Sequence, residues 1–396
     1  MKKKILFLIH TLNGGGAERV LANIVQHIDK EKFDITVTTI VNEGVYIDEI
    51  KKVKGVRYRY IFNSYFKKSR KDSNNRYNQS TTKIMNKIWD AYKWLIKNAF
   101  NKITYIMSIR RKYDIEVAFL EGMCAKIISA SPNKKSKKIA WIHTDITTLT
   151  KSSTTFKNEE EERECYKKFD KIVCVSNGVR EAFIKKTGIS KNVIRQINPI
   201  NDKEIITKSE EIIEKVKKSE RFVICSVGRL IHEKGYDRLL RCQKKLLDSG
   251  LNTELWIIGE GEERKKLEQY IEQEKLGDTV KLLGFENNPY KYIKNSDLFV
   301  SSSRVEGLSS VLCEAVILGK VIVTTECPGV SEILGNKGSR GAVITENNEE
   351  ALYEGLYNII SNKELYKEYK EKAKSKNKKF VLEKQIKSIE RIFERL

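Results

Sequence analysis

Short apolar runs alternate with amphipathic segments along most of the 396 residues. Residues 4–10 form a nearly continuous apolar run, which is typical of a strand buried in a parallel sheet. Residues 17–28 carry apolar side chains at helical spacing, and residues 34–40 are apolar again. This order predicts a βαβ unit. Further strands in the first half are predicted at 115–120, 138–143, 171–176 and 196–200.

The second half restarts the same alternation at residue 222. Two such series predict an α/β chain with two Rossmann-like parallel-sheet domains facing a cleft. We place the first domain at residues 1–200 and the second at 201–379, with the charged stretch 201–221 as the linker. The predicted strands are 222–227, 254–258, 280–283, 298–300 and 321–325, and the predicted helices are 235–249, 262–274, 289–295 and a run from Leu308.

Basic residues outnumber acidic ones, with 75 Lys and Arg against 53 Asp and Glu, and the formal charge is +22. Such an excess attracts polyanions, which include nucleic acid, anionic membranes and phosphorylated small molecules. The seven cysteines are scattered without a CxxC pair, so we expect small buried hydrophobic residues in a reducing compartment. No run approaches the roughly 20 apolar residues of a membrane span, and we expect a cytoplasmic protein.

One segment, residues 64–112, carries 13 Lys and Arg and two Asp, with aromatic and aliphatic side chains between them. Its first part, to about residue 82, is interpreted as a polar loop, and the rest as a basic amphipathic helix. Such a helix could lie on an anionic membrane surface, or it could pack its apolar face on the sheet. Both interpretations stay open. The first would hold the protein peripherally at the inner face of the cell membrane.

The stretch 301–332 combines two carboxylates with the start of a helix. Glu306 lies in the turn after the strand 298–300, and Glu314 lies on the helix that follows. A helix N-terminus offers free N–H groups and partial positive charge to an anion, and carboxylates accept hydrogen bonds from hydroxyl groups. The stretch therefore predicts a site for a diphosphate and sugar hydroxyls. An ordinary strand-to-helix turn is the alternative.

Two cations follow the first strand of the second half. Arg229 and Lys234 are five residues apart across a turn, where an Arg fork and a Lys point charge can hold phosphate oxygens. They would stabilise the charge on a leaving diphosphate without a metal, although a solvated charged turn is the simpler interpretation. The sequence has no D-x-D pair and no His and Cys cluster with ligand spacing, so no metal site is predicted.

Two features of the first half fit a ligand site. Gly15 and Gly16, in a run of three glycines after the first strand, let the backbone approach a ligand. Their spacing matches neither a dinucleotide fingerprint nor a P-loop. His143 ends the strand 138–143 at the carboxyl edge of the predicted sheet, where such sheets bind ligands. A buried structural imidazole is the other interpretation.

The motifs GRLIHEKGYDRLL, WIIGEGEERKKLE, LLGF and EGLSSVLCEAVILGKVIV, in this order, resemble the retaining glycosyltransferases of family 4. GGGAER and VSNGV in the first half also resemble that family, so the likeness covers essentially the whole chain. It implies a GT-B fold and an enzyme of the bacterial surface-polysaccharide type. Such an enzyme transfers a sugar from a nucleotide diphosphate donor with retention of configuration and without a metal. The likeness also implies that the last helix, about 380–396, packs back on the first domain.

The resemblance further implies roles for single residues. Arg229 and Lys234 would hold the donor diphosphate, Glu314 the ribose hydroxyls, and Glu306 would face the donor sugar. His143 would orient a sugar hydroxyl beside the reacting carbon. The other implied contacts are Gly284 and Phe285 with the base, Leu308, Ser309 and Ser310 with the diphosphate, and Gly15 and Gly16 with the phosphates from the other domain.

We therefore expect a metal-independent retaining transferase that moves a hexose or N-acetylhexosamine, carried on UDP rather than GDP, to a lipid-linked or glycan acceptor of the cell envelope. The nucleotide sugar is a substrate, and no cofactor is expected. One alternative is a nucleotide-sugar epimerase of the same fold. The other is a polyanion-binding protein. That class explains the positive charge but gives no role to Glu306 or Glu314, so no nucleic acid partner is expected.

Overall fold

The computed structural model describes residues 2–63, 87, 90, 91, 94, 105, 106, 108, 109, 111–147, 155–216, 220–335, 339–374 and 382–396. The chain forms two compact units. Unit 1 comprises Met1–Pro199 and Glu383–Leu396, and unit 2 comprises Ile200–Leu382. Each unit has its own parallel sheet.

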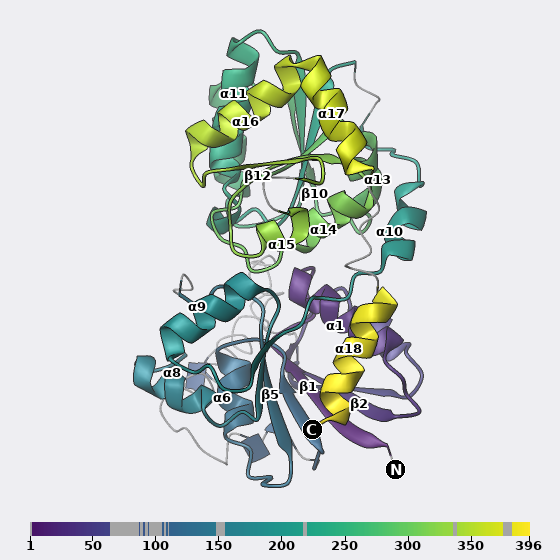
Figure 1. Cartoon of the computed structure of the whole chain (residues 1–396), viewed down its shortest axis with the longest axis vertical. Coiled ribbons are helices and arrows are strands. Elements are labelled where there is room, and N and C mark those ends of the chain that lie inside the picture. The colour runs from purple at the N-terminus through teal and green to yellow at the C-terminus, as the bar shows by residue number, and fades with distance from the viewer. Residues whose placement is uncertain are drawn as a thin grey trace, which may run out of the picture. The chain divides into compact units, whose positions relative to one another are not determined.

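Unit 1 contains seven parallel strands in the order β3-β2-β1-β4-β5-β6-β7. Figure 1 labels β5, β1 and β2 of this sheet. The side chains of residues 5–9 in β1 are buried, because helices cover both faces of this central strand. The strands are β1 Lys3–Ile9, β2 Phe33–Asn42, β3 Val56–Asn63, β4 Ile115–Ala118, β5 Lys137–Ile142, β6 Lys171–Cys174 and β7 Val193–Arg195.

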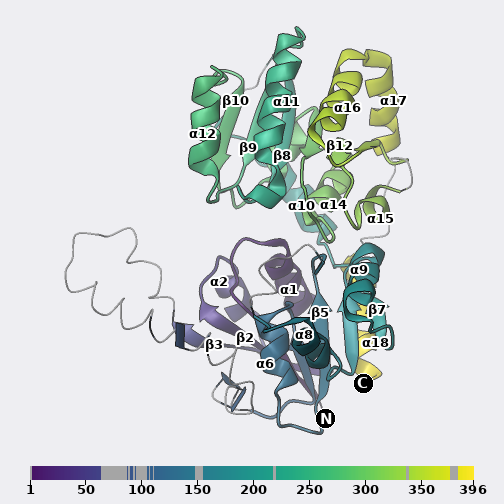
Figure 2. The ribbon, with the colours of Figure 1, turned by 90° about the vertical axis from the view of Figure 1, so that its left-hand side faces the viewer.

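The helices of unit 1 lie on both faces of the sheet (Figure 2). The chain leaves β1 toward β3 and leaves β4 toward β7, so right-handed crossovers place α1 and α2 opposite α6, α8 and α9. The C-terminal helix α18 packs on this unit, where the Phe393 ring meets Phe7 and Phe33 edge-on. The helices are α1 Gly16–His27, α2 Ile47–Lys51, α6 Met123–Ser129, α8 Glu159–Tyr166, α9 Asn177–Thr187 and α18 Leu382–Glu394.

Unit 2 contains six parallel strands in the order β10-β9-β8-β11-β12-β13. They are β8 Phe222–Val227, β9 Thr253–Ile258, β10 Val280–Gly284, β11 Leu298–Ser301, β12 Val321–Thr325 and β13 Ala342–Thr345. Its helices are α10 Asp202–Ser209, α11 Tyr236–Asp248, α12 Arg264–Gln273, α13 Tyr290–Asn295, α14 Ser310–Ile317, α15 Val330–Leu334, α16 Glu349–Ser361 and α17 Lys363–Ala373, with a short 3-10 turn at His232–Lys234.

The predicted fold class, two Rossmann-like parallel-sheet domains, is confirmed. Each sheet reverses its direction of growth once, between β1 and β4 in unit 1 and between β8 and β11 in unit 2. Ligands of open α/β sheets bind beside the carboxyl ends of the strands at such a switch point. The turns after these four strands are therefore the expected location of a ligand site.

Three predictions about single elements are wrong. The strand of the first half that we placed at 196–200 is β7 at Val193–Arg195, which begins three residues earlier and ends five residues earlier. The Gln196 amide still donates to the Cys174 carbonyl of β6, but Pro199 has no N–H group to extend the pairing. The stretch 201–221 is not only linker, since Asn201 caps α10 by accepting from the amide of Glu204. Val321–Thr325 does not complete its sheet, because β13 follows.

Most of the basic segment 64–112 lies outside the described residues, so its two interpretations remain untested. All seven cysteines are buried and free, as predicted for small hydrophobic side chains. Within the described parts of the chain, no helix has both the length and the apolar character needed to cross a bilayer.

Candidate functional site

The turn after β8 carries both predicted cations. Arg229 follows the strand and is exposed, while Lys234 closes the 3-10 turn His232–Lys234 before α11. The turn is held by backbone bonds, from Leu230 N–H to the Glu260 carbonyl and from Lys234 N–H to the Ile231 carbonyl. Two cations therefore stand on a short, hydrogen-bonded turn at the switch point of unit 2.

Glu306 reaches the same place from the neighbouring strand. It lies in the loop between β11 and α14, and β11 pairs with β8. Its carboxylate forms an ion pair with Lys234 and accepts a hydrogen bond from the Ser303 hydroxyl at 2.8 Å. Both charged side chains are less than one-fifth exposed. An acid and a base that are 72 residues apart in sequence thus form a half-buried pair at the switch point.

Two glycines allow the turns of this edge to approach one another closely. Gly235 has a positive φ of 65°, and a Cβ there would lie 2.2 Å from the Ser302 carbonyl oxygen. Gly259 has φ of 145°, and a Cβ there would lie 1.9 Å from the Gly228 carbonyl oxygen. Any larger residue would push these loops apart, so both glycines set the spacing of the site.

The other site residues predicted for unit 2 lie around the same sheet edge. Ser309 is the N-cap of α14 and is buried, and Glu314 lies on the second turn of that helix. Gly284 ends β10 with φ of 77°, and the Phe285 ring is 46% exposed. Leu308 is buried and Ser310 is the first residue of α14, two residues later than predicted.

The glycine loop of unit 1 follows β1. Gly15 is the N-cap of α1 and Gly16 is its first residue. The Glu18 carboxylate folds back over this helix start, since a Cβ on Gly15 would lie 2.3 Å from Glu18 Oε2. A carboxylate at a helix N-terminus is favoured by the exposed amides and the helix dipole. The helix start can therefore hold negative charge.

His143 follows β5 and is 8% exposed. Its ring lies beside two aromatic rings, with centroids 4.9 Å from Phe119 and 6.4 Å from Trp141. Among the described residues its Nε2 has no hydrogen-bond partner. Burial lowers the pKa of His143 to about 3, so the imidazole is neutral near pH 7. A neutral, unpartnered ring nitrogen can accept or donate one hydrogen bond to a ligand.

This buried imidazole predicts acid-sensitive folding. In the unfolded chain the His143 imidazole is protonated near pH 6.5, whereas in the folded protein it stays neutral down to about pH 3. The free energy of unfolding therefore falls as the pH falls between these values. Between pH 7 and pH 5 the loss is on the order of 2 kcal/mol. Denaturant unfolding at both pH values should show that loss in the wild-type protein and not in His143→Phe.

The exposed His27 of α1 supplies the matched control. His27→Gln should keep the full acid sensitivity of the wild-type protein. An equal loss of stability in His143→Phe and the wild-type protein would contradict a buried neutral imidazole at position 143.

The sequence did not single out several residues that shape these sites. The Glu121 carboxylate accepts from the His143 amide at 3.2 Å and from the Thr144 hydroxyl, and burial raises its pKa. Ser303 orients Glu306. Glu121 directly follows the strand predicted at 115–120, and Ser303 belongs to a serine run. These are the signals that could have marked them.

Within the described residues, no group of three or more His, Cys, Asp and Glu side chains could hold a metal ion. The structure brings together Lys234 and Glu306 of unit 2, with Arg229 on the same turn. His143, Gly15 and Gly16 belong to unit 1. The assigned roles of these residues stay predictions.

Residues 208–376 match the family model described as glycosyl transferases group 1. A stretch of 216 residues is 32% identical to the Campylobacter jejuni N-acetylgalactosamine-N,N'-diacetylbacillosaminyl-diphospho-undecaprenol 4-alpha-N-acetylgalactosaminyltransferase, covering 54% of this chain and 57% of that protein. An uncharacterized glycosyltransferase of Haemophilus influenzae is 25% identical over 98% of both chains.

Solved structures show the same fold over the full length. The Anabaena HepE structure in complex with UDP and glucose covers 100% of both chains with a TM-score of 0.74 at 17% identity. A TarM mutant of S. aureus covers 99% of this chain with a TM-score of 0.69 at 15% identity. Residues 208–376 are thus similar to the glycosyl transferases group 1 family, and the solved structures extend the likeness of fold, of the predicted GT-B type, over the whole chain.

Proposed function

We propose that this protein transfers a hexose or N-acetylhexosamine from a UDP sugar to a lipid-linked or glycan acceptor, with retention of configuration. The observation that carries the proposal is the pairing of Lys234 with Glu306 at the switch point of unit 2, with Arg229 on the same turn. The Campylobacter relative is named for adding a sugar to a diphospho-undecaprenol-linked saccharide. The HepE structure contains UDP and glucose.

The residues of unit 2 suit a leaving diphosphate. When the bond from the sugar to the phosphate breaks, negative charge grows on the departing phosphate oxygen. Arg229 and Lys234 stabilise that charge from the same turn, and this needs no metal ion. Lys234 must first exchange its ion pair with Glu306 for one with phosphate, which leaves the carboxylate free to accept a donor-sugar hydroxyl.

The proposed transfer is a same-face displacement. The acceptor oxygen bonds the anomeric carbon as the bond to phosphate breaks, and the hydroxyl proton passes to the departing phosphate. No side chain is assigned as a nucleophile. In unit 1, the unpartnered Nε2 of His143 would orient a sugar hydroxyl.

Ligand titration tests the donor site first. UDP, GDP and several UDP sugars are added without metal, and the melting temperature is followed. A ligand at a hundred times its Kd stabilises the folded state by about 2.7 kcal/mol. We expect UDP to raise the melting temperature in the wild-type protein and to do so far less in Arg229→Ala. No shift with any nucleotide would count against the proposal.

Product analysis separates transfer from the alternatives. A short-chain polyprenyl-diphosphate saccharide and a UDP sugar should give a product one sugar heavier, with an α linkage by NMR if the donor is α-linked. An epimerase would instead convert the donor sugar without any acceptor. Neither that activity nor nucleic-acid binding is favoured by the relatives of this chain.

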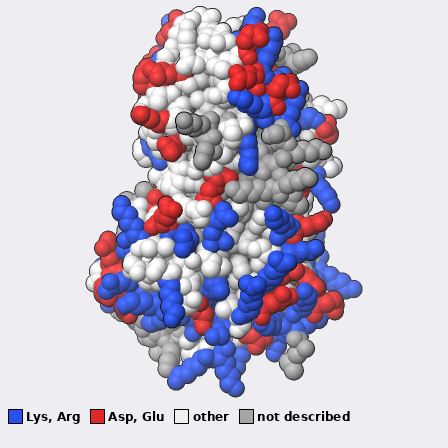
Figure 3. Space-filling view, in the orientation of Figure 1, with Lys and Arg blue, Asp and Glu red and all other residues white. Residues whose placement is uncertain are grey.

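We also propose that unit 1 docks on anionic lipid, where a lipid-linked acceptor would lie. Residues 1–200 carry 40 Lys and Arg against 20 Asp and Glu, which is +20 of the total +22. Lys and Arg crowd the face of unit 1 drawn in Figure 3. Lys51, Lys52, Lys54 and Arg59, called here the basic corner, are exposed on α2, β3 and the turn between them.

Vesicle sedimentation tests the basic corner. Each basic residue near an anionic surface contributes about 1 kcal/mol of attraction, so replacing all four by Gln should weaken binding to phosphatidylglycerol vesicles at least tenfold. As a control with the same charge change, Gln replaces the exposed Lys134, Lys135, Lys167 and Lys168. Equal weakening in both variants would point to net charge alone and against a docking corner.

A further inference from the structure

The loop that carries Glu306 is held at three successive backbone carbonyls. Ser302 O accepts from Arg238 of α11, with Nε at 2.8 Å. Ser303 O accepts from the Thr325 hydroxyl at 2.6 Å, and Arg304 O accepts from the side-chain amide of Asn347 at 2.9 Å. Three elements that are distant in sequence therefore fix one short loop.

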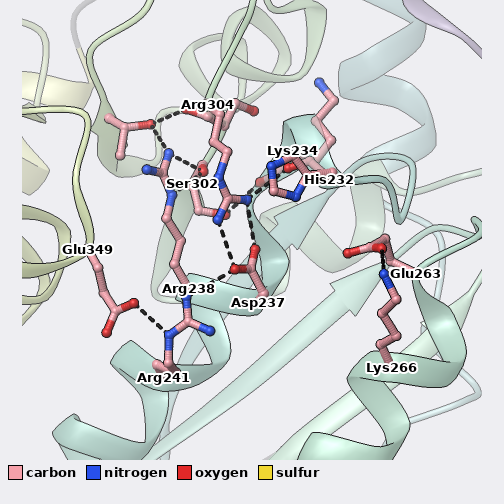
Figure 4. A network of polar contacts seen from close by, with 12 residues as sticks. His232, Lys234, Asp237, Arg238, Arg241, Glu263, Lys266, Ser302, Arg304 and Glu349 are labelled. Carbon is pink, nitrogen blue, oxygen red and sulfur yellow. Dashed lines mark hydrogen bonds and ion pairs between the residues drawn. The ribbon is translucent and has the colours of Figure 1, made fainter.

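The same loop is tied to the turn that carries Lys234. The Arg304 amide donates to the Glu233 carbonyl at 2.7 Å, and the Arg304 guanidinium donates to the His232 carbonyl at 2.8 Å. From the other side, the Ser302 hydroxyl donates to the Lys234 carbonyl at 2.9 Å. The loop and the turn thus form one braced assembly (Figure 4).

Asp237 on the first turn of α11 completes the brace. It accepts two hydrogen bonds from the Arg304 guanidinium, at 2.7 and 2.8 Å, in the parallel fork that Arg and carboxylate form best. Burial opposes ionisation of Asp237, but the hydrogen bonds from Arg304 and Arg241 outweigh it and hold the pKa well below its usual range. The carboxylate therefore stays ionised across the working pH range.

Arg238 is the buried member of the assembly. It is 4% exposed, and besides Ser302 it donates to Asn347 Oδ1 at 2.8 Å. A buried guanidinium is stable only with its acceptors in place. Because Ser302 O also lies against Gly235, the loop has little room to shift toward α11 or away from it.

We propose that Asp237, Arg238 and Arg304 are positioning residues for sugar transfer. They hold Glu306 in place beside Lys234 at the switch point. The inference rests on the proposed function of this site. None of the three needs to touch the substrate, because they act through the loop and the turn. A displacement of about 1 Å in a reacting site can cost about 10²-fold in rate, so bracing of this kind affects turnover directly.

The test measures kcat, the KM for the donor, UDP affinity and melting temperature in Arg304→Lys, Arg304→Gln, Asp237→Asn and the double variant Asp237→Asn/Arg304→Gln. Lys keeps the charge but lacks the planar fork, so it should not restore the wild-type rate. We expect kcat about tenfold lower in each single variant, with UDP affinity within about twofold of wild type. The double variant should be no slower than the slower single one, because both remove the same contact.

The pair Lys244 and Asp248 lies on the same helix and supplies the control, as an exposed ion pair four residues apart. Lys244→Gln and Asp248→Asn should leave kcat unchanged. Wild-type kcat in the Asp237 and Arg304 variants, or UDP affinity that falls in step with kcat, would overturn this inference but leave the proposed function standing. A wild-type protein without transfer activity would overturn the proposed function and this inference with it.

Discussion

The Lys234→Met variant is expected to transfer sugar about 10²- to 10³-fold more slowly than the wild-type protein, with its fold intact. Met keeps the apolar stem, which packs beside Gly228, where a Cβ would lie 3.6 Å from both Cδ and Cε of Lys234. Only the charge is lost. The leaving diphosphate then lacks one fixed cation as its negative charge develops. Initial rates of product formation at saturating UDP sugar measure the loss.

Lys266 offers a matched control for this substitution. It is also paired with a glutamate, Glu263, at 2.6 Å, but it is 74% exposed on α12 (Figure 4). Lys266→Met should therefore keep the wild-type rate, because exposed ion pairs contribute little. The rate of sugar transfer should also fall in Arg229→Ala, as it does in Lys234→Met. Turnover near wild type in Lys234→Met would remove Lys234 from the reaction.

Glu306→Gln is expected to separate turnover from nucleotide binding. Gln keeps the shape of the side chain and can still accept from the Ser303 hydroxyl. It releases Lys234 from its ion pair and removes a negative charge near the diphosphate, so UDP should bind several-fold more tightly. Turnover should fall about 10²-fold, because the carboxylate no longer accepts from the donor sugar in the transition state.

Calorimetric titration with UDP and initial rates test the two halves of this prediction separately. Glu263→Gln, which removes the carboxylate paired with the exposed Lys266, should change neither quantity. UDP affinity that is equal or weaker in Glu306→Gln would show that Glu306 does not compete with the diphosphate for Lys234. An unchanged rate would exclude Glu306 from the catalytic step.

Much of the fold could be predicted from local pattern. Buried parallel strands are continuous apolar runs, and β8, β11 and β12 appear in the sequence within one residue of their observed bounds. Strands that depart from this pattern were missed. β3 alternates Arg and Tyr at the edge of its sheet, and β13 is an edge strand whose two central residues are only partly buried. The short helix α10 was hidden in a charged stretch, although Asn201 and Glu204 form a capping pattern.

The candidate site was likewise predictable only where its geometry depends on residues close in sequence. Arg229 and Lys234 share one turn, so their proximity follows from five residues of sequence. Glu306 could be marked as a turn carboxylate, but its pairing with Lys234 needed the β8 and β11 neighbours. His143 could be placed at a sheet edge, while its burial and its unpartnered Nε2 could not. Nothing local in Asp237, Arg238 or Arg304 distinguishes them from surface charges.

The sequence by itself determined the strand and helix alternation, the two-domain plan and the residue types available at each strand end, because these depend on local periodicity and turn chemistry. Only the tertiary structure decided which strand ends become neighbours. The order of strands in a parallel sheet depends on long crossovers whose destination no local pattern encodes. At the switch point between β8 and β11, that order turns two separate charged turns into one braced acid–base pair.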